Sequence, residues 1–283
     1  MTSSKFIALS AHTFSFEQLA DIYNESRVDY IVPMPMNAKR LAEYVHQYDV
    51  DLSASVVAVN ADHQVAGVGM LGLRGQRAWI TRLGVIPTRR GRGIGQAIME
   101  ALLHNAVERG CTQVQLEVIE GNEPAYDLFV KLGFSPTRRL LVIRRAPGST
   151  GQLPFSISSQ PLQASEILDC LHHRTDMPSW LDETPSILYN GGAQGLSVST
   201  SDGAMGWIVL RPTVFQLSHF VLGTDAGDLS HDLALSLLTA VHTTFNRRDT
   251  KIENIPADSA LIPIFESLNY AHEFARIEMS SPL

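Results

Sequence analysis

The pattern of apolar and polar residues divides the N-terminal half of the chain into short helices and strands. Apolar residues recur at helical spacing in three segments, which predicts amphipathic helices at residues 15–25, 37–48 and 93–109. Runs rich in β-branched residues predict strands at residues 5–9, 53–60, 64–73, 77–85, 113–119 and 140–145. Asn122 and Gly133 delimit one more helix at residues 124–132. This mixture predicts an α+β fold.

The second half of the chain repeats this order of elements at an offset of about 136 residues. The aligned segments are residues 220–222 with 84–86, residues 236–238 with 101–103, and residues 264–270 with 128–134. We interpret the two halves as copies of one α+β unit, the second of them diverged. The alternative is that the second half is an unrelated α+β domain that only supports the first.

The segment Ala146–Pro154 separates the two halves. It contains Pro, Gly and Ser without apolar periodicity, which is typical of a linker. We therefore expect a first domain at residues 1–147, a linker at residues 148–154 and a second domain at residues 155–283.

Composition and charge exclude several classes of function. With 283 residues and 45% hydrophobic content, the chain is typical of a soluble protein of two domains. Residues 1–147 hold 16 Lys+Arg against 14 Asp+Glu, and residues 148–283 hold 6 against 15, so neither half has the basic surplus of a nucleic-acid-binding protein. No apolar run approaches the ~20 residues that cross a bilayer. We expect a cytoplasmic protein that binds neither nucleic acid nor membrane.

Cysteine and histidine give no sign of a disulfide framework or a metal site. Cys111 and Cys170 are the only cysteines, and we expect both to be buried thiols. The ten histidines, including the pair His172-His173, lack the spacing of metal ligands.

The segment Arg90-Gly91-Arg92-Gly93-Ile94-Gly95 lies between a predicted strand and the start of a predicted helix. A glycine-rich turn at a helix N-terminus brings several backbone N–H groups together at the positive end of the helix dipole, which favours a diphosphate. The segment lacks the Lys-Ser/Thr ending of a P-loop and the glycine spacing of a dinucleotide fold. It therefore predicts a different kind of phosphate site.

Four motifs follow one another around this segment. They are Leu83-Gly84-Val85 with Arg90-x-x-Gly93-x-Gly95, then Leu116-Glu117-Val118, then Asn122-x-x-Ala125-x-x-Leu128-Phe129, then Gly133-Phe134. In this order and spacing they resemble the GNAT superfamily of N-acetyltransferases. The resemblance covers residues 80–134 strongly and residues 5–145 weakly, and it reaches the second half only through the repeat.

The resemblance implies two GNAT-like domains in tandem, each a mixed, mostly antiparallel sheet flanked by helices. It implies an enzyme that moves the acetyl group of acetyl-coenzyme A to a primary amine, on a small molecule or a protein, by direct attack in a ternary complex. The cofactor-binding residues that it implies are Leu83, Gly84, Val85, Arg90, Gly91, Arg92, Gly93, Ile94, Gly95, Gln96, Asn122 and Phe129.

The resemblance also suggests catalytic residues. An alkylamine with a pKa near ~10 is protonated at neutral pH and must lose a proton before it attacks a thioester. Glu117 lies where several family members carry a glutamate base, and its alternative role is that of a paired or solvated carboxylate. The family often has tyrosine at the position of Phe129, where it protonates the leaving thiolate. Tyr126 lies three residues earlier on the same helix and is our candidate replacement, with packing against the sheet as the alternative.

The second half departs from the family pattern at its own cofactor loop. Residues 223–232 carry three aspartates and no arginine, so we expect this copy not to bind a diphosphate. Ile262 takes the place of Tyr126. Since a tandem pair supplies internally the contact that single-domain relatives make by dimerising, we favour a monomer.

Three functions stay open at this point. Acetyl transfer to an amine is the leading hypothesis. Phe129 and the degenerate second copy also fit a sensor that binds acetyl-coenzyme A without catalysis, and nothing in the sequence excludes a longer acyl group. Met34 and Met36 are candidates for an apolar acceptor pocket, and Trp180 and Trp207 for closing the site, although core packing explains all four as well.

Overall fold

The computed structural model describes residues 6–151, 156–225 and 227–283, and it divides into two compact units. The first unit comprises the residues up to Arg138 together with Ile277–Leu283, and the second comprises Arg139–Arg276. These units differ from the expected domains, because strands β6 (Ser135–Arg145) and β12 (Ala271–Pro282) each contribute residues to both. The segment 277–283 therefore belongs to the first unit despite its place at the far end of the sequence.

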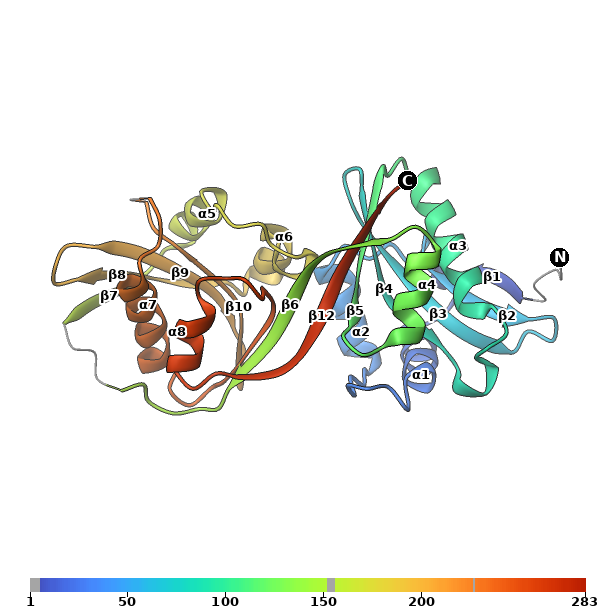
Figure 1. Ribbon diagram of the computed structural model, residues 1–283, viewed down its shortest axis with the longest axis horizontal. Coiled ribbons are helices and arrows are strands. Elements are labelled where there is room, and N and C mark those ends of the chain that lie inside the picture. Colours follow the sequence, from blue (N-terminus) through green and yellow to red (C-terminus); the bar gives the residue numbers. More distant parts are fainter. Residues whose placement is uncertain (1–5, 152–155, 226) are drawn as a thin grey trace. The chain divides into compact units, whose positions relative to one another are not determined.

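The helices and strands that the sequence predicts for residues 5–132 form the first unit, with ends shifted by a few residues, whereas the predicted strand at residues 140–145 is the part of β6 that lies in the second unit (Figure 1). The elements of the first unit are β1 (Phe6–Ser10), α1 (Phe16–Ser26), α2 (Ala38–Gln47), β2 (Val56–Asn60), β3 (Val65–Arg74), β4 (Arg77–Val85), α3 (Ile94–Glu108), β5 (Gln113–Ile119), α4 (Glu123–Lys131) and the start of β6, with short 3₁₀ turns at Ala11–Thr13 and Pro87–Arg89. Strands β1 to β4 are antiparallel neighbours in sequence order, and β5 joins β4 in parallel. The mixed, mostly antiparallel sheet is thereby confirmed.

Local sequence signals explain where the helices begin. Ser15 caps α1, since its side chain accepts from the backbone N–H of Gln18 while the Gln18 side chain accepts from the Ser15 N–H. Asn37 caps α2 by accepting from the backbone N–H of Arg40. Helix α3 has no such side-chain cap, because its N-cap residue is Gly93.

The sheet of the first unit carries helices on both faces. Ile80 of β4 packs in a core with Ile98 and Leu102 of α3 and with Met279 of β12. Adjacent residues of a strand point to opposite faces. Trp79 therefore lies on the other face, where its ring is 6.2 Å from that of Tyr44 on α2.

The second unit repeats the element order of the first, which confirms the internal repeat at the level of the fold. Its elements are the end of β6, β7 (Ile157–Pro161), α5 (Ala164–His172), a 3₁₀ turn at Trp180–Asp182, α6 (Thr184–Leu188), a 3₁₀ turn at Tyr189–Gly191, β8 (Gln194–Thr200), β9 (Met205–Pro212), β10 (Gln216–Gly223), α7 (His231–Thr244), β11 (Asp249–Pro256), α8 (Ile262–Ser267) and the start of β12. Strands β10 and β11 are parallel, as β4 and β5 are. Both β4 and β10 have a bulge at a residue with positive φ, Arg82 at 53° and His219 at 54°.

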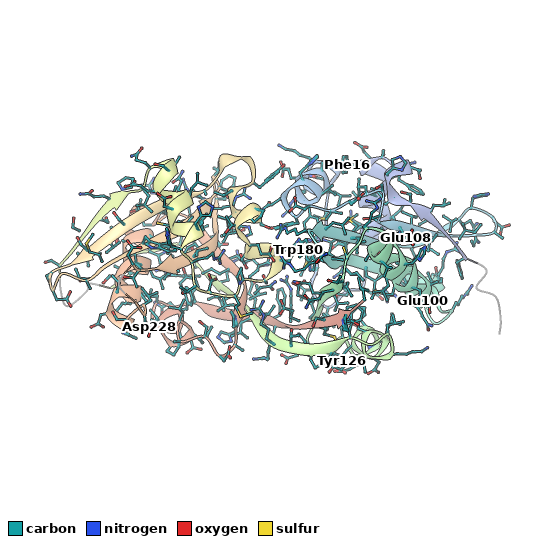
Figure 2. The ribbon with its side chains drawn as sticks, turned by 90° about the horizontal axis from the view of Figure 1, so that it is seen from above. Phe16, Glu100, Glu108, Tyr126, Trp180 and Asp228 are labelled. Carbon is teal, nitrogen blue, oxygen red and sulfur yellow. The ribbon has the colours of Figure 1, made fainter. Side chains whose placement is uncertain are left out.

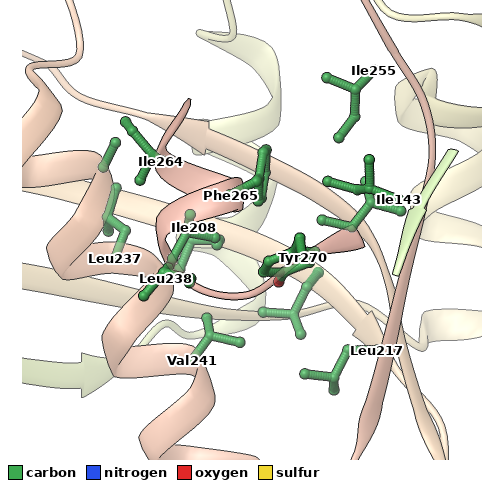
Figure 3. Packing of buried hydrophobic residues seen from close by; sticks show 14 of the residues in the cluster. Ile143, Ile208, Leu217, Leu237, Leu238, Val241, Ile255, Ile264, Phe265 and Tyr270 are labelled. Atoms are coloured by element: carbon green, nitrogen blue, oxygen red, sulfur yellow. The ribbon is translucent and has the colours of Figure 1, made fainter. Parts of the chain in front are cut away.

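The core of the second unit forms between its sheet and helices α7 and α8 (Figure 3). Leu237 and Leu238 of α7 meet Phe265 of α8, and Tyr270 closes the cluster. The imidazole of His242 on α7 is also fully buried here, and its Nε2 is 2.8 Å from the Tyr270 hydroxyl. Burial lowers the pKa of His242 to about 4.

The predicted linker is fixed at its start by Arg145. This buried guanidinium donates to the carbonyl oxygens of Ala146, Gly148 and Ser149. Residues 152–155 of the expected linker lie outside the described residues.

The described residues bear on three further expectations. Cys111 is buried and Cys170 is half-buried, and both are free thiols. In the part of the chain that the structure describes, no three His, Cys, Asp or Glu side chains gather as metal ligands would. Nor is any helix there long and apolar enough to cross a membrane.

Candidate functional site

A cavity of about 350 Å³ lies in the first unit at the N-terminal end of α3, and we call it the α3 cavity. Four segments line it: the end of α1 with the connection that follows, the end of β4, the glycine-rich loop into α3, and the first turns of α4. The lining residues fall within 26–31, 83–85, 90–95 and 122–128. The first and the third of the four sequence motifs therefore meet around one space.

The end of β4 reaches the cavity because its pairing with β5 stops early. The parallel register joins Arg77–Ile80 to Gln113–Leu116 and does not extend beyond them. The bulge at Arg82 follows directly, and Leu83, Gly84 and Val85 then border the cavity. This end of the strand is thus not covered by β5, and the carbonyls of Leu83 and Val85 there accept hydrogen bonds from Arg27 and Arg90 instead.

Gly84 permits the close approach of α1 to β4. A Cβ atom at this position would lie 2.8 Å from the Cβ of Ser26 and in contact with the Ser26 hydroxyl. Ser26 is the last residue of α1 and is buried, and its Oγ donates to the Tyr23 carbonyl at 2.8 Å. Any side chain at residue 84 would therefore displace the wall of the cavity.

The glycine-rich loop has the backbone conformation of an anion site. Gly91 and Gly93 have φ of 74° and 79°, a region that side-chain-bearing residues rarely adopt. Since the N-cap Gly93 offers no side chain, the first N–H groups of α3 have no side-chain cap. Ile94 and Gly95 of that first turn line the cavity. The helix thus directs free backbone donors and its positive dipole end towards the cavity.

The arginines of this loop differ in their contacts. Arg92 is exposed. Arg90, one of the cofactor-binding residues that the resemblance implies, makes a bidentate ion pair with Asp29, with both N–O distances at 2.7 Å. Its remaining donors reach the carbonyls of Val85 at 3.0 Å and Ser26 at 3.1 Å. The ion pair holds the pKa of the Asp29 carboxyl below its usual value. An acidic side chain thus lines the same cavity as the loop.

Tyr30 and Asn122 meet at the opposite wall. The Nδ2 of Asn122 donates to the Tyr30 hydroxyl at 3.3 Å, and both residues line the cavity. The guanidinium of Arg27 stacks over the Tyr30 ring at 3.5 Å and donates to the Leu83 carbonyl at 3.2 Å. Asn122 is the N-cap residue of α4, but its side chain makes no capping hydrogen bond there. It contacts Tyr30 instead.

Glu117 lies outside the lining of the α3 cavity. It is half-buried on β5, and its Oε2 accepts from the indole Nε1 of Trp79 at 2.9 Å. The same side of the sheet holds Tyr44, whose hydroxyl is 2.6 Å from Thr81 Oγ1 and whose pKa is raised by burial to about 12. Arg82 stacks on the Tyr44 ring at 4.1 Å. This carboxylate therefore sits among aromatic side chains beneath α2.

Helix α4 carries two more of the predicted site residues. Phe129 is buried in the core with its ring centroid 6.1 Å from that of Phe134, so it packs as a core residue rather than lining the cavity. Tyr126 (Figure 2) is half-buried and packs on the same core.

On α3, Gln96 bonds outside the cavity. Its Nε2 donates to Glu100 at 2.8 Å and its Oε1 accepts from Lys131 at 2.8 Å. Glu100 and Glu108 mark the exposed side of the helix (Figure 2). Of the predicted cofactor residues, Arg92, Gln96 and Phe129 are thus the ones whose side chains point elsewhere.

Sequence reasoning missed Arg27, Asp29 and Tyr30. They lie between α1 and α2, where no periodicity marks a side chain as facing inward. The one signal available was two charged residues and a phenol in an otherwise apolar connection. Met34, which we considered for an acceptor pocket, is half-buried there with its sulfur 3.9 Å from the Arg82 guanidinium.

The corresponding helix of the second unit, α7, has a side-chain cap. Ser230 caps α7 by accepting from the backbone N–H of Leu233 at 3.3 Å. Trp207, which we considered for closing a site, packs against Gly223 at the end of β10. Trp180 is fully buried. At the position in the first unit equivalent to Ser230, the N-cap Gly93 makes no such side-chain bond.

Comparison with known proteins finds similarity to the family that the motifs resemble. Residues 16–134 match the family model described as "Acetyltransferase (GNAT) family". The whole chain resembles a GCN5-related N-acetyltransferase from Sphaerobacter thermophilus, with 15% identity, a TM-score of 0.74, and coverage of 100% of this chain and 97% of that one. A putative acetyltransferase from Pyrococcus horikoshii matches at 15% identity and a TM-score of 0.63, covering 100% and 91%.

A tandem GNAT protein from the clavulanic acid biosynthesis pathway is also similar. It has 15% identity and a TM-score of 0.65, and the match covers 98% of each chain. The structural matches show that the tandem fold extends over both units.

Proposed function

Because residues 16–134 form a domain of the acetyltransferase (GNAT) family, we propose that this chain transfers the acetyl group of acetyl-coenzyme A to a primary amine. The observation that carries the proposal is the uncapped N-terminus of α3. It faces a cavity that is also bordered by the free end of β4 and the start of α4. Family membership supports acyl transfer from a coenzyme A thioester, and the choice of acetyl is ours.

We assign the diphosphate of the donor to the loop Arg90–Gly95, whose backbone N–H groups meet it without a competing side chain. The end of β4 would receive the pantetheine arm through the backbone of Leu83 and Val85. The Val85 N–H would then stabilise the oxyanion that forms when the amine attacks the thioester. Asn122 would complete the opposite wall.

We assign the removal of the amine proton to Glu117. Where the amine does not reach this carboxylate directly, a water molecule between them would carry the proton. The indole N–H of Trp79 holds one of its oxygens in place, so the carboxylate is oriented before the substrate arrives. We expect Glu117→Gln, which keeps the shape and the hydrogen bond from Trp79, to lower kcat about 10²-fold with little change in the Kd of acetyl-coenzyme A. Glu120→Gln on the neighbouring exposed position is the matched control. An unchanged kcat in Glu117→Gln would leave the base unassigned.

The first test is calorimetric titration of acetyl-coenzyme A into the full chain. Gly95→Asp places an anion in the proposed diphosphate site without backbone strain, unlike Gly93, where φ is 79°. Gly95→Ala is the control for added size, since its Cβ would make only ordinary contacts at 3.4 Å to Leu128 and 3.6 Å to Val85.

We expect wild type and Gly95→Ala to bind one donor per chain and Gly95→Asp to lose binding. A screen of primary amines for release of free coenzyme A then identifies the acceptor. No binding to wild type would refute the proposal.

Two other proposals concern the reaction. Phe129 is buried against Phe134 and leaves no phenol at the family's usual position, which favours a second candidate function, a sensor that binds acetyl-coenzyme A without turning it over. Absence of thiol release with every amine would support the sensor. Preference for a longer thioester in the same titration would identify a longer acyl group.

The remaining proposals concern the protein as a whole. The excess of 15 Asp+Glu over 6 Lys+Arg in residues 148–283 suits a cationic acceptor. We propose that only the first unit binds the donor, since Ser230 caps the corresponding helix of the second. We further propose a cytoplasmic monomer, which light scattering tests directly.

A further inference from the structure

The α3 cavity contains one phenol, at a position that the family motifs do not mark. Tyr30 lines the cavity from the connection after α1, and its hydroxyl accepts from Asn122 at 3.3 Å. Phe129 has no hydroxyl and lies in the core. Tyr126, our sequence-based candidate for the acid, packs on that core too. Among the described residues that line this cavity, the proton donor next to the start of α4 is therefore Tyr30.

The phenol is held at this place from several sides. Its ring lies under the Arg27 guanidinium at 3.5 Å, and Arg27 in turn donates to the Leu83 carbonyl at the end of β4. The backbone N–H of Tyr30 donates to the Arg27 carbonyl at 3.1 Å. The neighbouring Asp29 is anchored to Arg90. The hydroxyl is thus fixed relative to both walls between which the thioester would lie.

We propose that Tyr30 is the general acid that protonates the leaving coenzyme A thiolate. The inference rests on the proposed function, because it places the thioester beside Leu83 and Val85. The amine nitrogen forms a bond to the carbonyl carbon, and the C=O electrons move to oxygen. When the carbonyl re-forms, the C–S bond breaks and its electron pair goes to sulfur. The Tyr30 O–H gives its proton to that sulfur, and the proton released by the amine returns to the phenolate through water.

The surroundings of Tyr30 suit this exchange. The stacked Arg27 guanidinium lies close enough to stabilise a transient phenolate, and Asn122 donates a hydrogen bond to the same oxygen. The thiolate of a thiol with a pKa near ~8.5 is a tolerable leaving group even without an acid. We therefore expect the Tyr30 hydroxyl to raise kcat by an amount at the lower end of the range for general acid catalysis, on the order of 10²-fold.

The test is Tyr30→Phe, which keeps the ring under Arg27 and removes only the hydroxyl. Thiol release from acetyl-coenzyme A is measured with the amine found in the screen or with water as acceptor, because the same C–S bond breaks in both. Tyr126→Phe tests the other candidate acid, and Tyr189→Phe, which removes the hydroxyl of a ring beneath the Arg211 guanidinium in the second unit, is the matched control. Calorimetry gives the Kd of acetyl-coenzyme A for each variant.

We expect Tyr30→Phe to lower kcat on the order of 10²-fold with Kd and KM unchanged, and Tyr189→Phe to behave as wild type. A rise in Kd with kcat unchanged would show that Tyr30 only positions Asn122, and loss of activity in Tyr126→Phe alone would return the role to that residue. Either result overturns the proposal. Failure of wild type to bind acetyl-coenzyme A or release thiol would instead refute the proposed function, and the inference with it.

Discussion

Adding one methyl group at Gly84 gives a sharp test of the cavity wall. In Gly84→Ala the new Cβ would lie 2.8 Å from the Cβ of Ser26 and in contact with its hydroxyl. Ser26 cannot yield easily, because it is buried at the end of α1 and its hydroxyl is bonded to the Tyr23 carbonyl. Overpacking of this kind costs about 1–3 kcal/mol, and loss of that hydrogen bond adds about 1 kcal/mol.

We therefore expect Gly84→Ala to lower the stability of the first unit by about 2–4 kcal/mol. At about 2–4 °C per kcal/mol for a unit of this size, Tm should fall by roughly 5–15 °C in scanning calorimetry. Gly95→Ala should instead raise the stability of the first unit. Gly95 lies in the first turn of α3, where alanine favours the helix by up to about 1 kcal/mol, and the added Cβ would make only ordinary contacts.

The double variant Gly84→Ala/Ser26→Gly removes both atoms that clash, and we expect it to recover part of the lost stability. If Gly84→Ala melts within about 1 °C of wild type, α1 does not approach β4 as closely as described here, and the reasoning fails.

Three further predictions follow from other contacts. Asp29→Asn removes a negative charge from the cavity and breaks the ion pair with Arg90. The Kd of acetyl-coenzyme A should therefore fall about 3- to 10-fold at low salt and by less at high salt, and an unchanged Kd would contradict this. Since the pKa of His242 is about 4 in the folded chain and ~6.5 when unfolded, the unfolded state binds the extra proton between these pH values. The second unit should therefore lose about 3 kcal/mol as pH falls from 6.5 to 4, and urea unfolding of wild type against His242→Asn isolates that slope. Met279→Ala should destabilise the first unit by about 2–5 kcal/mol in thermal unfolding, because this side chain is fully buried in its core; a wild-type Tm would refute the assignment.

Most of the fold follows from local signals in the sequence. Periodicity located the helices and strands, and Ser15 and Asn37 marked the starts of α1 and α2, because a cap is a contact between residues three apart. The glycine-rich loop was recognisable for the same reason, since Gly91 and Gly93 act through their own backbone conformation.

Local sequence signals do not predict contacts between residues that are far apart in the chain. Nothing in the sequence near Asp29 indicates that it pairs with Arg90, or near Tyr30 that it meets Asn122. The burial of Phe129 against Phe134 depends on how α4 is rotated about its axis where it packs on the sheet. The spacing of apolar residues within α4 does not determine that rotation. The boundary at residues 148–154 was expected from composition, whereas the compact units are set by the pairing of strands.

The return of β12 to the first unit has a consequence for how this protein is made. Met279 fills the core beside α3, so that core stays open until this residue has left the ribosome. The first unit therefore completes its folding only after every residue of the second, up to Arg276, has been synthesised. A nascent chain halted after the first half would expose the apolar surface that Met279 covers and would be a natural target for chaperones or proteases.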